Sequence, residues 1–512
     1  MDFSRGSGIL LHITSLPGPY GIGTLGRSAL EFIDFLADAG QRYWQILPSG
    51  PTSGFLGHSP YMNFSAFAGN PLIICLDWLE EKGWLDKDHL LRAEEFSEYF
   101  VEFDKVVAFH YSMLELAFQG FCRQHISYAY GEFLQREGYW LNDYALFMAF
   151  REESGGLPWN RWPHSIAKGD PAAMVAAHLR LSDRIAFHQF VQYCFDLQWD
   201  EMKNHAGERG VLLIGDMPIY VGFDSVDVWA NQGNYRLDYS CLEPTHVAGV
   251  PPDYFSETGQ RWGNPLYRWT LAEEEMTTPL YGWWEKRFLR MLGQVDVCRI
   301  DHFRGFESYW EIPAEEETAM NGEWVKGPGS FFFEWMRRQL GELPIIAEDL
   351  GIITKEVTAL RRKLGFPGMK ILQFAFESDE TNDYLPHNFH SENCVVYTGT
   401  HDNNTTLGWF MGETLTASVR ERICRYLQSD GHQVSRQMIR LALSSVAKVA
   451  LFPMQDLLGF GEDCRMNTPG TSEGNWQWRC AGRFFDSEVK DWLRGETEFY
   501  NRLKPSKTIT VA

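Results

Sequence analysis

Eight short apolar runs, each ending in polar residues, do most to limit how this chain can fold. They cover residues 8–13, 42–48, 211–218, 295–302, 344–351, 369–376, 394–402 and 449–456. Most are separated by stretches of helical periodicity, such as residues 28–38, which stop at Gly40. A strand-then-helix unit repeated eight times predicts a TIM barrel, the (β/α)8 fold with a closed parallel sheet.

Two gaps between these runs are too long to be simple connections. Residues 77–205 repeat apolar side chains three to four positions apart, so we expect a helical insertion subdomain there. Residues 220–293 are rich in Gly, Pro, Asn and aromatic residues, which predicts a loop-rich insertion over the active-site cleft. The remaining residues, 1–76 and 206–512, are expected to form the catalytic barrel.

The charge and composition limit the classes of partner. The 512 residues carry 46 basic and 68 acidic side chains, a net charge of −22, which argues against nucleic acid as a ligand. Aromatic residues make up 15% of the chain and include 19 Trp. Flat apolar faces bordered by polar groups stack on sugar rings, so this excess mildly favours a carbohydrate ligand.

The cysteines and the hydropathy pattern predict the compartment. Nine cysteines are scattered from Cys75 to Cys480 without a Cys-x-x-Cys pair, and no secretion signal is apparent. This odd, unpatterned set predicts reduced thiols in a cytoplasmic protein. We expect no membrane partner, because no uncharged apolar run is long enough to span a bilayer.

Acidic residues close five of the eight runs: Asp216, Asp301, Glu348, Asp402 and Asp456. In a TIM barrel the active site lies at the carboxyl ends of the strands, so these acids are expected to converge on one cleft. Crowded carboxylates shift one another's pKa values, which allows one site to hold both an acid and a base. Two carboxylates without a metal or redox group suit glycosidic bond cleavage.

Each acid has a predicted role. Arg299 and Asp301 project from the same side of a strand, so the guanidinium is expected to hold Asp301 ionised as a nucleophile. A structural ion pair at a strand end is the competing interpretation. Glu348 follows an apolar run, and burial would raise its pKa toward that of a proton donor. Asp402 would bind sugar hydroxyls and stabilise positive charge on the ring, whereas Asp349 points to the other face and is expected to be structural.

Several stretches carry a family resemblance. The chain resembles 4-α-glucanotransferases, also called amylomaltases or disproportionating enzymes, of the α-amylase superfamily. The resemblance covers nearly the whole chain and includes residues 8–17, 59–61, 215–218, 250–265, 299–305, 347–351, 399–403 and 467–470.

The resemblance implies the same three roles for Asp301, Glu348 and Asp402, and it implies a glucan-binding cleft. The implied substrate-binding residues are Ser59, Tyr61, Asp216, Asp253, Gln260, Trp262, Arg299, His302, His401 and Asn467. The sequence departs from some relatives near Phe55, where they carry a Tyr as part of a second glucan-binding surface. Phe can stack but lacks a hydroxyl that could donate a hydrogen bond.

The resemblance also implies the reaction and the partners. The enzyme would cleave an α-1,4-glucan by a retaining double displacement and transfer the glucanosyl segment to a 4-hydroxyl of another glucan or of glucose. Its partners would be malto-oligosaccharides and longer α-1,4-glucans, bound without a cofactor or metal by a monomer or weak homo-oligomer. We expect Trp262 and Tyr254 to shield the cleft and offer an acceptor sugar a stacking face, which favours transfer over hydrolysis.

Four other interpretations remain open at this stage. Residues 21–26 fit the dinucleotide-binding pattern Gly-x-Gly-x-x-Gly, although the run 42–48 ends without the acid that would hold a ribose. His12, His302 and His401 near run ends suggest a metal-dependent hydrolase, although the metal-binding patterns His-x-His and His-Glu-x-x-His are missing. A plain α-glucan hydrolase and a non-catalytic glucan-binding protein are the nearest alternatives.

Overall fold

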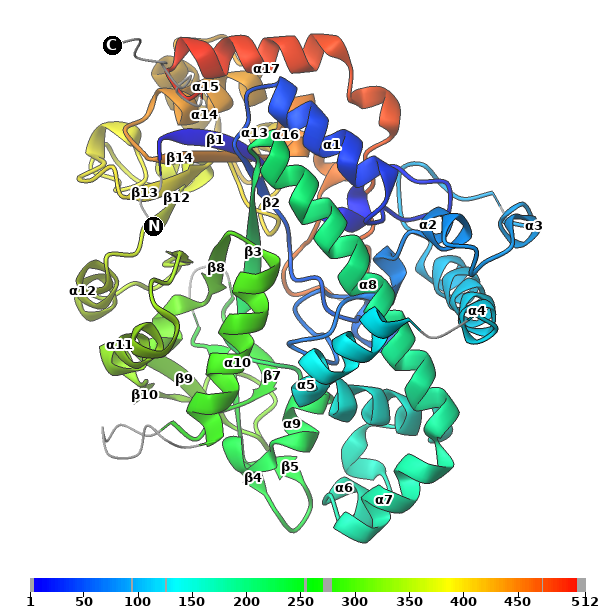
Figure 1. Ribbon diagram of the computed structural model, residues 1–512. Coiled ribbons are helices and arrows are strands. Elements are labelled where there is room, and N and C mark those ends of the chain that lie inside the picture. Colours follow the sequence, from blue (N-terminus) through cyan, green and yellow to red (C-terminus); the bar gives the residue numbers. More distant parts are fainter. Residues whose placement is uncertain are drawn as a thin grey trace, which may run out of the picture.

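Eight parallel strands form a closed barrel in the order β1-β14-β13-β12-β11-β8-β3-β2 (Figure 1). The computed structural model describes residues 4–93, 95–124, 127–252, 256–269, 279–471 and 473–503. The barrel strands are β1 (Gly6–Leu10), β2 (Tyr43–Gln45), β3 (Leu212–Pro218), β8 (Val297–Asp301), β11 (Ile345–Ala347), β12 (Gly368–Ile371), β13 (Cys394–Tyr397) and β14 (Val449–Pro453). Each overlaps one of the eight predicted runs, which confirms the TIM barrel.

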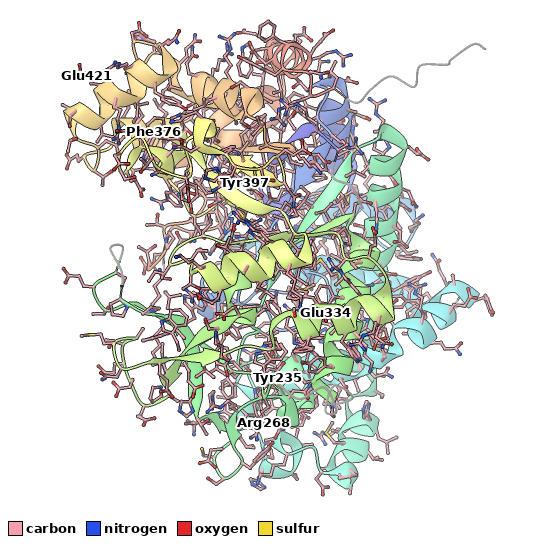
Figure 2. The ribbon with its side chains drawn as sticks, turned by 90° about the vertical axis from the view of Figure 1, so that its left-hand side faces the viewer. Tyr235, Arg268, Glu334, Phe376, Tyr397 and Glu421 are labelled. Carbon is pink, nitrogen blue, oxygen red and sulfur yellow. The ribbon has the colours of Figure 1, made fainter. Side chains whose placement is uncertain are left out.

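Side chains fill the inside of the barrel. Because successive residues of a strand point to opposite faces, alternate apolar residues of neighbouring strands turn inward and pack together. Ile214, Val297, Val395 and Leu451 are at most 1% exposed in this cluster. Tyr397 donates its hydroxyl hydrogen to the Gln45 amide oxygen at 2.9 Å. Tyr397 thus lies in the barrel interior, whereas Glu421 lies out on a surface helix (Figure 2).

Amphipathic helices cover the barrel. In α1 (Arg27–Asp38), Phe32, Ile33 and Leu36 are buried along one face, as their three-to-four spacing requires. The other helices between or after the barrel strands are α8 (Ser182–Arg209), α9 (Val226–Ala230), α10 (Pro279–Gln294), α11 (Gly329–Leu340), α12 (Lys355–Leu364), α13 (Thr406–Met411), α14 (Ala417–Leu427), α15 (Val434–Ser444), α16 (Met454–Leu458) and α17 (Ser487–Phe499).

The range 77–205 is helical, as predicted. It contains most or all of α2 (Leu76–Glu81), α3 (Lys87–Leu90), α4 (Phe103–Cys122), α5 (Tyr128–Glu153), α6 (His164–Ala167), α7 (Pro171–Arg180) and α8. Helix α8 packs against α4 and α5 as well as against α1 and β3, so it joins this helical region to the barrel wall. The boundaries of the proposed subdomain stay a prediction.

A second sheet lies outside the barrel, in a region where the sequence indicated loops. Its four antiparallel strands are β6 (His246–Val250), β7 (Gln260–Pro265), β9 (Ser308–Pro313) and β10 (Glu323–Lys326), in the order β10-β9-β6-β7. A two-stranded sheet of β4 (Leu237–Asp238) and β5 (Glu243–Pro244) lies nearby in the chain. The stretch 250–265 is therefore not an irregular loop throughout. Strand β6 also pairs with β9, which comes after β8, and such non-local pairing leaves no local sequence signal.

The glycines of the dinucleotide-like pattern are explained by packing. A Cβ atom on Gly21 would lie 2.5 Å from the Phe96 ring, and Gly21 has a φ of +80°. A Cβ on Gly23 would lie 2.0 Å from the Ile13 carbonyl oxygen, and one on Gly26 would lie 2.2 Å from the sulfur of Cys75. Each glycine permits a close approach of neighbouring chain, so the pattern has a structural reason unrelated to a dinucleotide.

All nine cysteines lie in described parts of the chain and are free thiols. Among the helices of the described residues, none combines the length and apolarity needed to cross a membrane.

Candidate active site

A buried arginine joins two of the predicted acids at the carboxyl end of the barrel. Strands β3 and β8 are neighbours, and their register places Asp216 opposite Arg299. Nη1 of Arg299 donates to both carboxylate oxygens of Asp216 at 2.7 Å, and Nη2 lies 3.0 Å from Oδ1 of Asp301. Arg299 is 3% exposed and Asp216 is 1% exposed. Such charge-assisted contacts fix the guanidinium between the two carboxylates.

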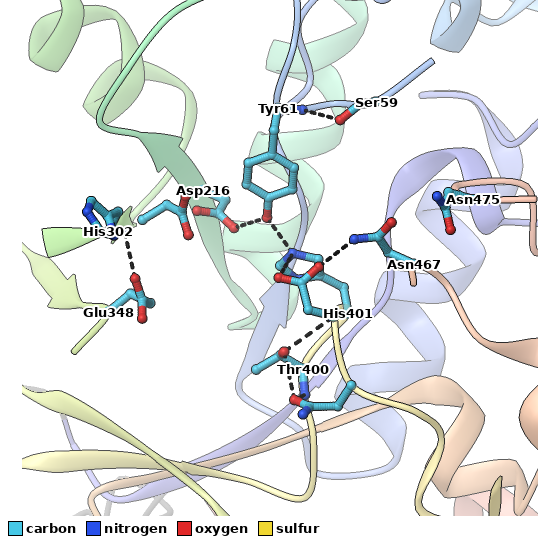
Figure 3. A network of polar contacts seen from close by, with 12 residues as sticks. Ser59, Tyr61, Asp216, His302, Glu348, Thr400, His401, Asn467 and Asn475 are labelled. Carbon is cyan, nitrogen blue, oxygen red and sulfur yellow. Dashed lines mark hydrogen bonds and ion pairs between the residues drawn. The ribbon is translucent and has the colours of Figure 1, made fainter. Parts of the chain in front are cut away.

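A chain of polar contacts extends from this arginine to the third acid (Figure 3). The hydroxyl of Tyr61 lies 2.7 Å from Oδ2 of Asp216 and 2.9 Å from Nε2 of His401. The same His401 nitrogen lies 3.4 Å from Oδ2 of Asp402. Nδ2 of Asn467 donates to the other Asp402 oxygen at 2.6 Å. Tyr61 and His401, from separate segments of the chain, thereby connect Asp216 with Asp402.

Backbone N–H groups hold Glu348 at the end of β11. The N–H of His302 donates to Oε2 at 2.6 Å, and the N–H of Leu350 donates to Oε1 at 2.8 Å. His302 adopts a left-handed conformation with a φ of +53°, which turns its N–H toward Glu348. The His302 ring meets Trp262 edge-on at 4.8 Å between centroids. Trp262 in turn donates its indole N–H to Gln260 at 3.1 Å.

The crowding of carboxyls changes their protonation. Burial raises the pKa of Asp301 to about 8, with Asp216, Glu348 and Asp402 adding to the rise and Arg299 opposing it. Burial also raises the pKa of Glu348, against Arg299 and the two backbone N–H groups. Arg299 favours the ionised form of Asp301, as expected, but burial and the other three carboxyls outweigh it in the net direction of the pKa shift. The two carboxyls act as a coupled pair that retains a proton near neutral pH, one ionised and one protonated.

The histidines near the cleft are neutral. Burial lowers the pKa of His12 and of His302 to about 3, and it also lowers the pKa of His401. Neutral imidazoles both donate and accept hydrogen bonds, which suits uncharged sugar hydroxyls. Within the part of the chain that the structure describes, no group of three or more His, Cys, Asp or Glu is arranged to hold a metal ion.

Other predicted residues take supporting or distant positions. Oγ of Ser59 accepts the N–H of Tyr61 at 3.3 Å, so Ser59 shapes the turn before Tyr61. Asp253, together with Tyr254, lies outside the described residues. Phe55 is 93% exposed. Asp349 is structural as expected, since it pairs with the Arg361 guanidinium at 2.8 Å and accepts the N–H of Met369 at 2.8 Å.

Asp456 does not join the cleft, which corrects the sequence analysis. It lies in α16 and is 1% exposed. Its carboxylate accepts the hydroxyls of Thr398 and Thr406 at 2.5 and 2.7 Å and the N–H of Thr406 at 2.6 Å. Asp456 therefore anchors both ends of the loop that carries Asp402. It points away from the other acids because α16 begins directly after β14 and changes the direction of its side chain.

Two residues that the sequence analysis missed support the site. Arg465 donates to the backbone oxygens of Asp402 and Asn467, both at 2.6 Å. Trp476 has a φ of +64°, rare for an aromatic residue, and its ring centroid lies 5.8 Å from Tyr61 and 6.0 Å from His401. Arg465 and Trp476 both lie in an irregular segment without hydrophobic periodicity. Apart from the motif at Asn467, that segment carries no sequence pattern that would identify site residues.

The fold and the site define a TIM-barrel enzyme whose active centre is built from carboxyl groups around a buried arginine. The chain belongs to the 4-alpha-glucanotransferase family, which matches residues 11–484. The resemblance stated from the sequence is thereby confirmed.

Individual relatives match over nearly their full length. The 4-alpha-glucanotransferase of Synechocystis sp. is 49% identical over 505 residues, covering 98% of this chain and 97% of that protein. The Thermus thermophilus 4-alpha-glucanotransferase is 47% identical, covering 98% and 100%. The structure of amylomaltase from Streptococcus agalactiae in complex with acarbose superposes with a TM-score of 0.93 at 39% identity, covering 98% and 100%.

The raised pKa of Asp301 predicts a pH-dependent gain in stability for Asp301→Asn. A carboxyl with a pKa of about 8 when folded and about 4 when unfolded stabilises the protein at low pH, and this contribution is lost as the pH rises between those values. The amide carries no such dependence. The Tm of Asp301→Asn minus that of the wild type should therefore increase from pH 4 to pH 8, measured by calorimetry. Glu421→Gln, at an exposed site on α14, is the control and should give a flat difference. A flat difference for Asp301→Asn would contradict the assignment.

Proposed function

We propose that this chain is a retaining 4-α-glucanotransferase in which Asp301 is the nucleophile, Glu348 the general acid and base, and Asp402 the transition-state stabiliser. The observation that carries the proposal is the convergence of these three carboxyls at the carboxyl end of a barrel in a chain of this family. The donor sugar would lie among Tyr61, Asp216, Arg299, His302 and His401, whose polar atoms form the network around the acids.

In the first half-reaction Glu348 gives its proton to the glycosidic oxygen while ionised Asp301 attacks the anomeric carbon. The bond from this carbon to the departing sugar breaks as the bond to the Asp301 oxygen forms. The raised pKa of Glu348 suits a proton donor, and two backbone N–H groups keep its oxygens in place. Asp402, held by Asn467, stabilises the positive charge that develops on the ring.

In the second half-reaction an acceptor sugar takes the place of the departed one. Its 4-hydroxyl gives a proton to Glu348, now ionised, and the hydroxyl oxygen attacks the anomeric carbon. The bond to Asp301 breaks, which restores both carboxyls and retains the configuration of the anomeric carbon. Water competes for the same covalent intermediate, so the product depends on which molecule occupies the acceptor side.

Trp262 is the side chain that we propose favours the acceptor sugar. It is half-buried, contacts His302 edge-on, and lies on β7 in the sheet outside the barrel. His302 holds the proton donor Glu348 through its backbone N–H. Trp262 therefore lies one residue away from the group that activates the acceptor, where an indole face can stack on a sugar and exclude water.

The finer partner and compartment assignments are proposed on the same basis. We propose that malto-oligosaccharides and longer α-1,4-glucans are the substrates, that the protein acts as a monomer or weak homo-oligomer, and that it acts in the cytoplasm. Nine free thiols support a reducing compartment. Light scattering during size-exclusion chromatography tests the oligomeric state, and a stable tetramer or larger assembly would contradict it.

The three carboxyl assignments predict large losses of activity. Asp301→Asn, Glu348→Gln and Asp402→Asn should each lower turnover of maltotriose by at least about a thousandfold, because they remove the nucleophile, the proton donor and the charge-stabilising group respectively. Circular dichroism should show the wild-type fold. Glu421→Gln makes the same chemical change as Glu348→Gln at an exposed site and should keep full activity. Near-normal turnover in any of the three variants removes that residue from the mechanism.

The test of the activity is incubation of the purified protein with maltotriose alone in the presence of a chelator. We expect a ladder of longer oligosaccharides together with free glucose, since each transfer lengthens one chain and shortens another. Glucose and maltose with nothing longer would identify a hydrolase. Unchanged maltotriose would identify a binding protein, and activity lost to the chelator would support the metal-dependent alternative.

The role of Trp262 predicts a change in product partition. Trp262→Ala should raise the ratio of hydrolysis to transfer several-fold, because it opens the acceptor side to water and removes a stacking face worth about 1 kcal/mol. The ratio is measured as reducing ends released per glucanosyl segment transferred. Trp324→Ala, at a partly exposed indole on β10, is a matched control expected to leave the ratio unchanged.

A further inference from the structure

A small cavity lies beside His401. Its volume is about 20 Å³, and its lining includes His12, Thr400, His401, Asn404 and Arg465. A cavity of this size has room for one water molecule, and its partly apolar wall, which includes Leu11 and Leu47, leaves few polar atoms to bind that water. Nδ1 of His12 and Nδ1 of His401 are both buried and have no hydrogen-bonding partner among the described residues. His12 is 6% exposed and His401 is 4% exposed, so bulk solvent does not satisfy these nitrogens.

The polar contacts around Tyr61 determine which ring nitrogen of His401 carries the hydrogen. Arg299 has no acceptor, so it donates to Asp216, and the Asp216 carboxylate only accepts. Burial and Asp216 raise the pKa of Tyr61, so its hydroxyl keeps the hydrogen and gives it to Asp216. The Tyr61 oxygen is then left as an acceptor for Nε2 of His401 at 2.9 Å.

A second contact of the same nitrogen leads to the same tautomer. Nε2 of His401 also lies 3.4 Å from a carboxylate oxygen of Asp402. A bare nitrogen there would face two acceptor oxygens, whereas an N–H attracts both. His401 is neutral, because burial lowers its pKa, so a hydrogen on Nε2 leaves Nδ1 as an acceptor. That acceptor lies in a buried position and needs a donor.

We propose that the cavity binds one water molecule, which accepts a hydrogen bond from Nδ1–H of His12 and donates one to Nδ1 of His401. His12 is thereby a positioning residue that acts through His401. Every bond in the resulting chain then runs in one direction, from His12 through the water, His401 and Tyr61 to Asp216. The water stabilises the one tautomer that presents an N–H to Asp402.

The position of His12 in the fold suits this role. It follows β1 (Gly6–Leu10), so it lies at the carboxyl end of the barrel with the other site residues. Strand β1 pairs with β14, and β14 pairs with β13, whose following loop carries His401 and Asp402. His12 and His401 therefore come from different barrel segments and line the same cavity.

The first test compares two substitutions of His12 by kinetics with maltotriose. His12→Leu removes the donor and should lower kcat about tenfold to a hundredfold with little change in KM, since supporting partners of site residues contribute about this much. His12→Asn can place an amide N–H near the position of Nδ1 and should restore most of kcat. His110→Leu removes another fully buried histidine, on α4, and should keep the wild-type kcat. Wild-type kcat in His12→Leu would overturn the proposal.

The second test measures the tautomer directly and needs no activity. In protein labelled with ¹⁵N-histidine, long-range proton–nitrogen correlation spectra distinguish a protonated from a bare ring nitrogen, and the variant His401→Gln assigns the signals. The wild type should show His401 protonated at Nε2 with its Nδ1 nitrogen shift typical of a hydrogen-bonded acceptor, and His12→Leu should move that Nδ1 shift toward the value of an acceptor without a donor. A wild-type His401 protonated at Nδ1, or an unchanged Nδ1 shift in His12→Leu, overturns the proposal.

The kinetic consequence rests on the proposed function, but the tautomer does not. A protein that fails to elongate maltotriose while showing the expected His401 tautomer refutes the transferase activity and leaves the water site standing. A protein that elongates maltotriose with the other tautomer refutes the water site alone. A crystal structure at high resolution adds a third measurement, since a water within hydrogen-bonding distance of both Nδ1 atoms is expected and a cavity without one contradicts the proposal.

Discussion

The Arg299 guanidinium between Asp216 and Asp301 is the interaction on which the arrangement of the site depends. It is buried, so removing Asp216 would leave the guanidinium without its bidentate partner in a place where water cannot replace it. The register of β3 and β8 brings Asp216 opposite Arg299, and a shift by one residue would turn one of them to the other face of the sheet. Barrel closure and charge pairing therefore require the same strand alignment. Asp216 in turn positions Tyr61 by accepting its hydroxyl hydrogen, and Tyr61 positions His401 through its contact with Nε2.

The site places several acids close together, and this arrangement has a cost in stability. Burial and mutual repulsion raise the pKa values of Asp301 and Glu348, which means that ionising them disfavours the folded state. A barrel optimised for stability alone would have apolar or amide side chains at these strand ends. Retaining the acids is the usual compromise of an active centre, where function requires groups in strained or charged surroundings.

The sequence predicted the barrel well, because hydrophobic periodicity and strand-end chemistry are local signals. All eight runs became barrel strands, and Asp216, Asp301, Glu348 and Asp402 belong to one set of polar contacts at the carboxyl end of the barrel. Asp456 was misassigned because a helix starting directly after its strand reverses the direction of the side chain, which periodicity does not reveal. The second sheet was missed because β6 pairs with β9 across about sixty residues. Trp476 was missed because its position depends on a left-handed backbone in an irregular segment.

The three carboxyls are supported in different ways, and this difference matters for the mechanism. Asp301 ends β8 and Glu348 directly follows β11, so the barrel itself fixes both. Asp402 instead lies on the loop between β13 and α13, and its position is set by contacts from elsewhere: Asp456 holds the two ends of the loop, while Arg465 and Asn467 hold Asp402. The groups that make and break bonds are thus held by the barrel strands themselves. Asp402, which stabilises charge, is held by a polar network of Arg465 and Asn467. Its carboxylate is therefore oriented before positive charge develops on the sugar ring, and the reorganisation that water would require is avoided.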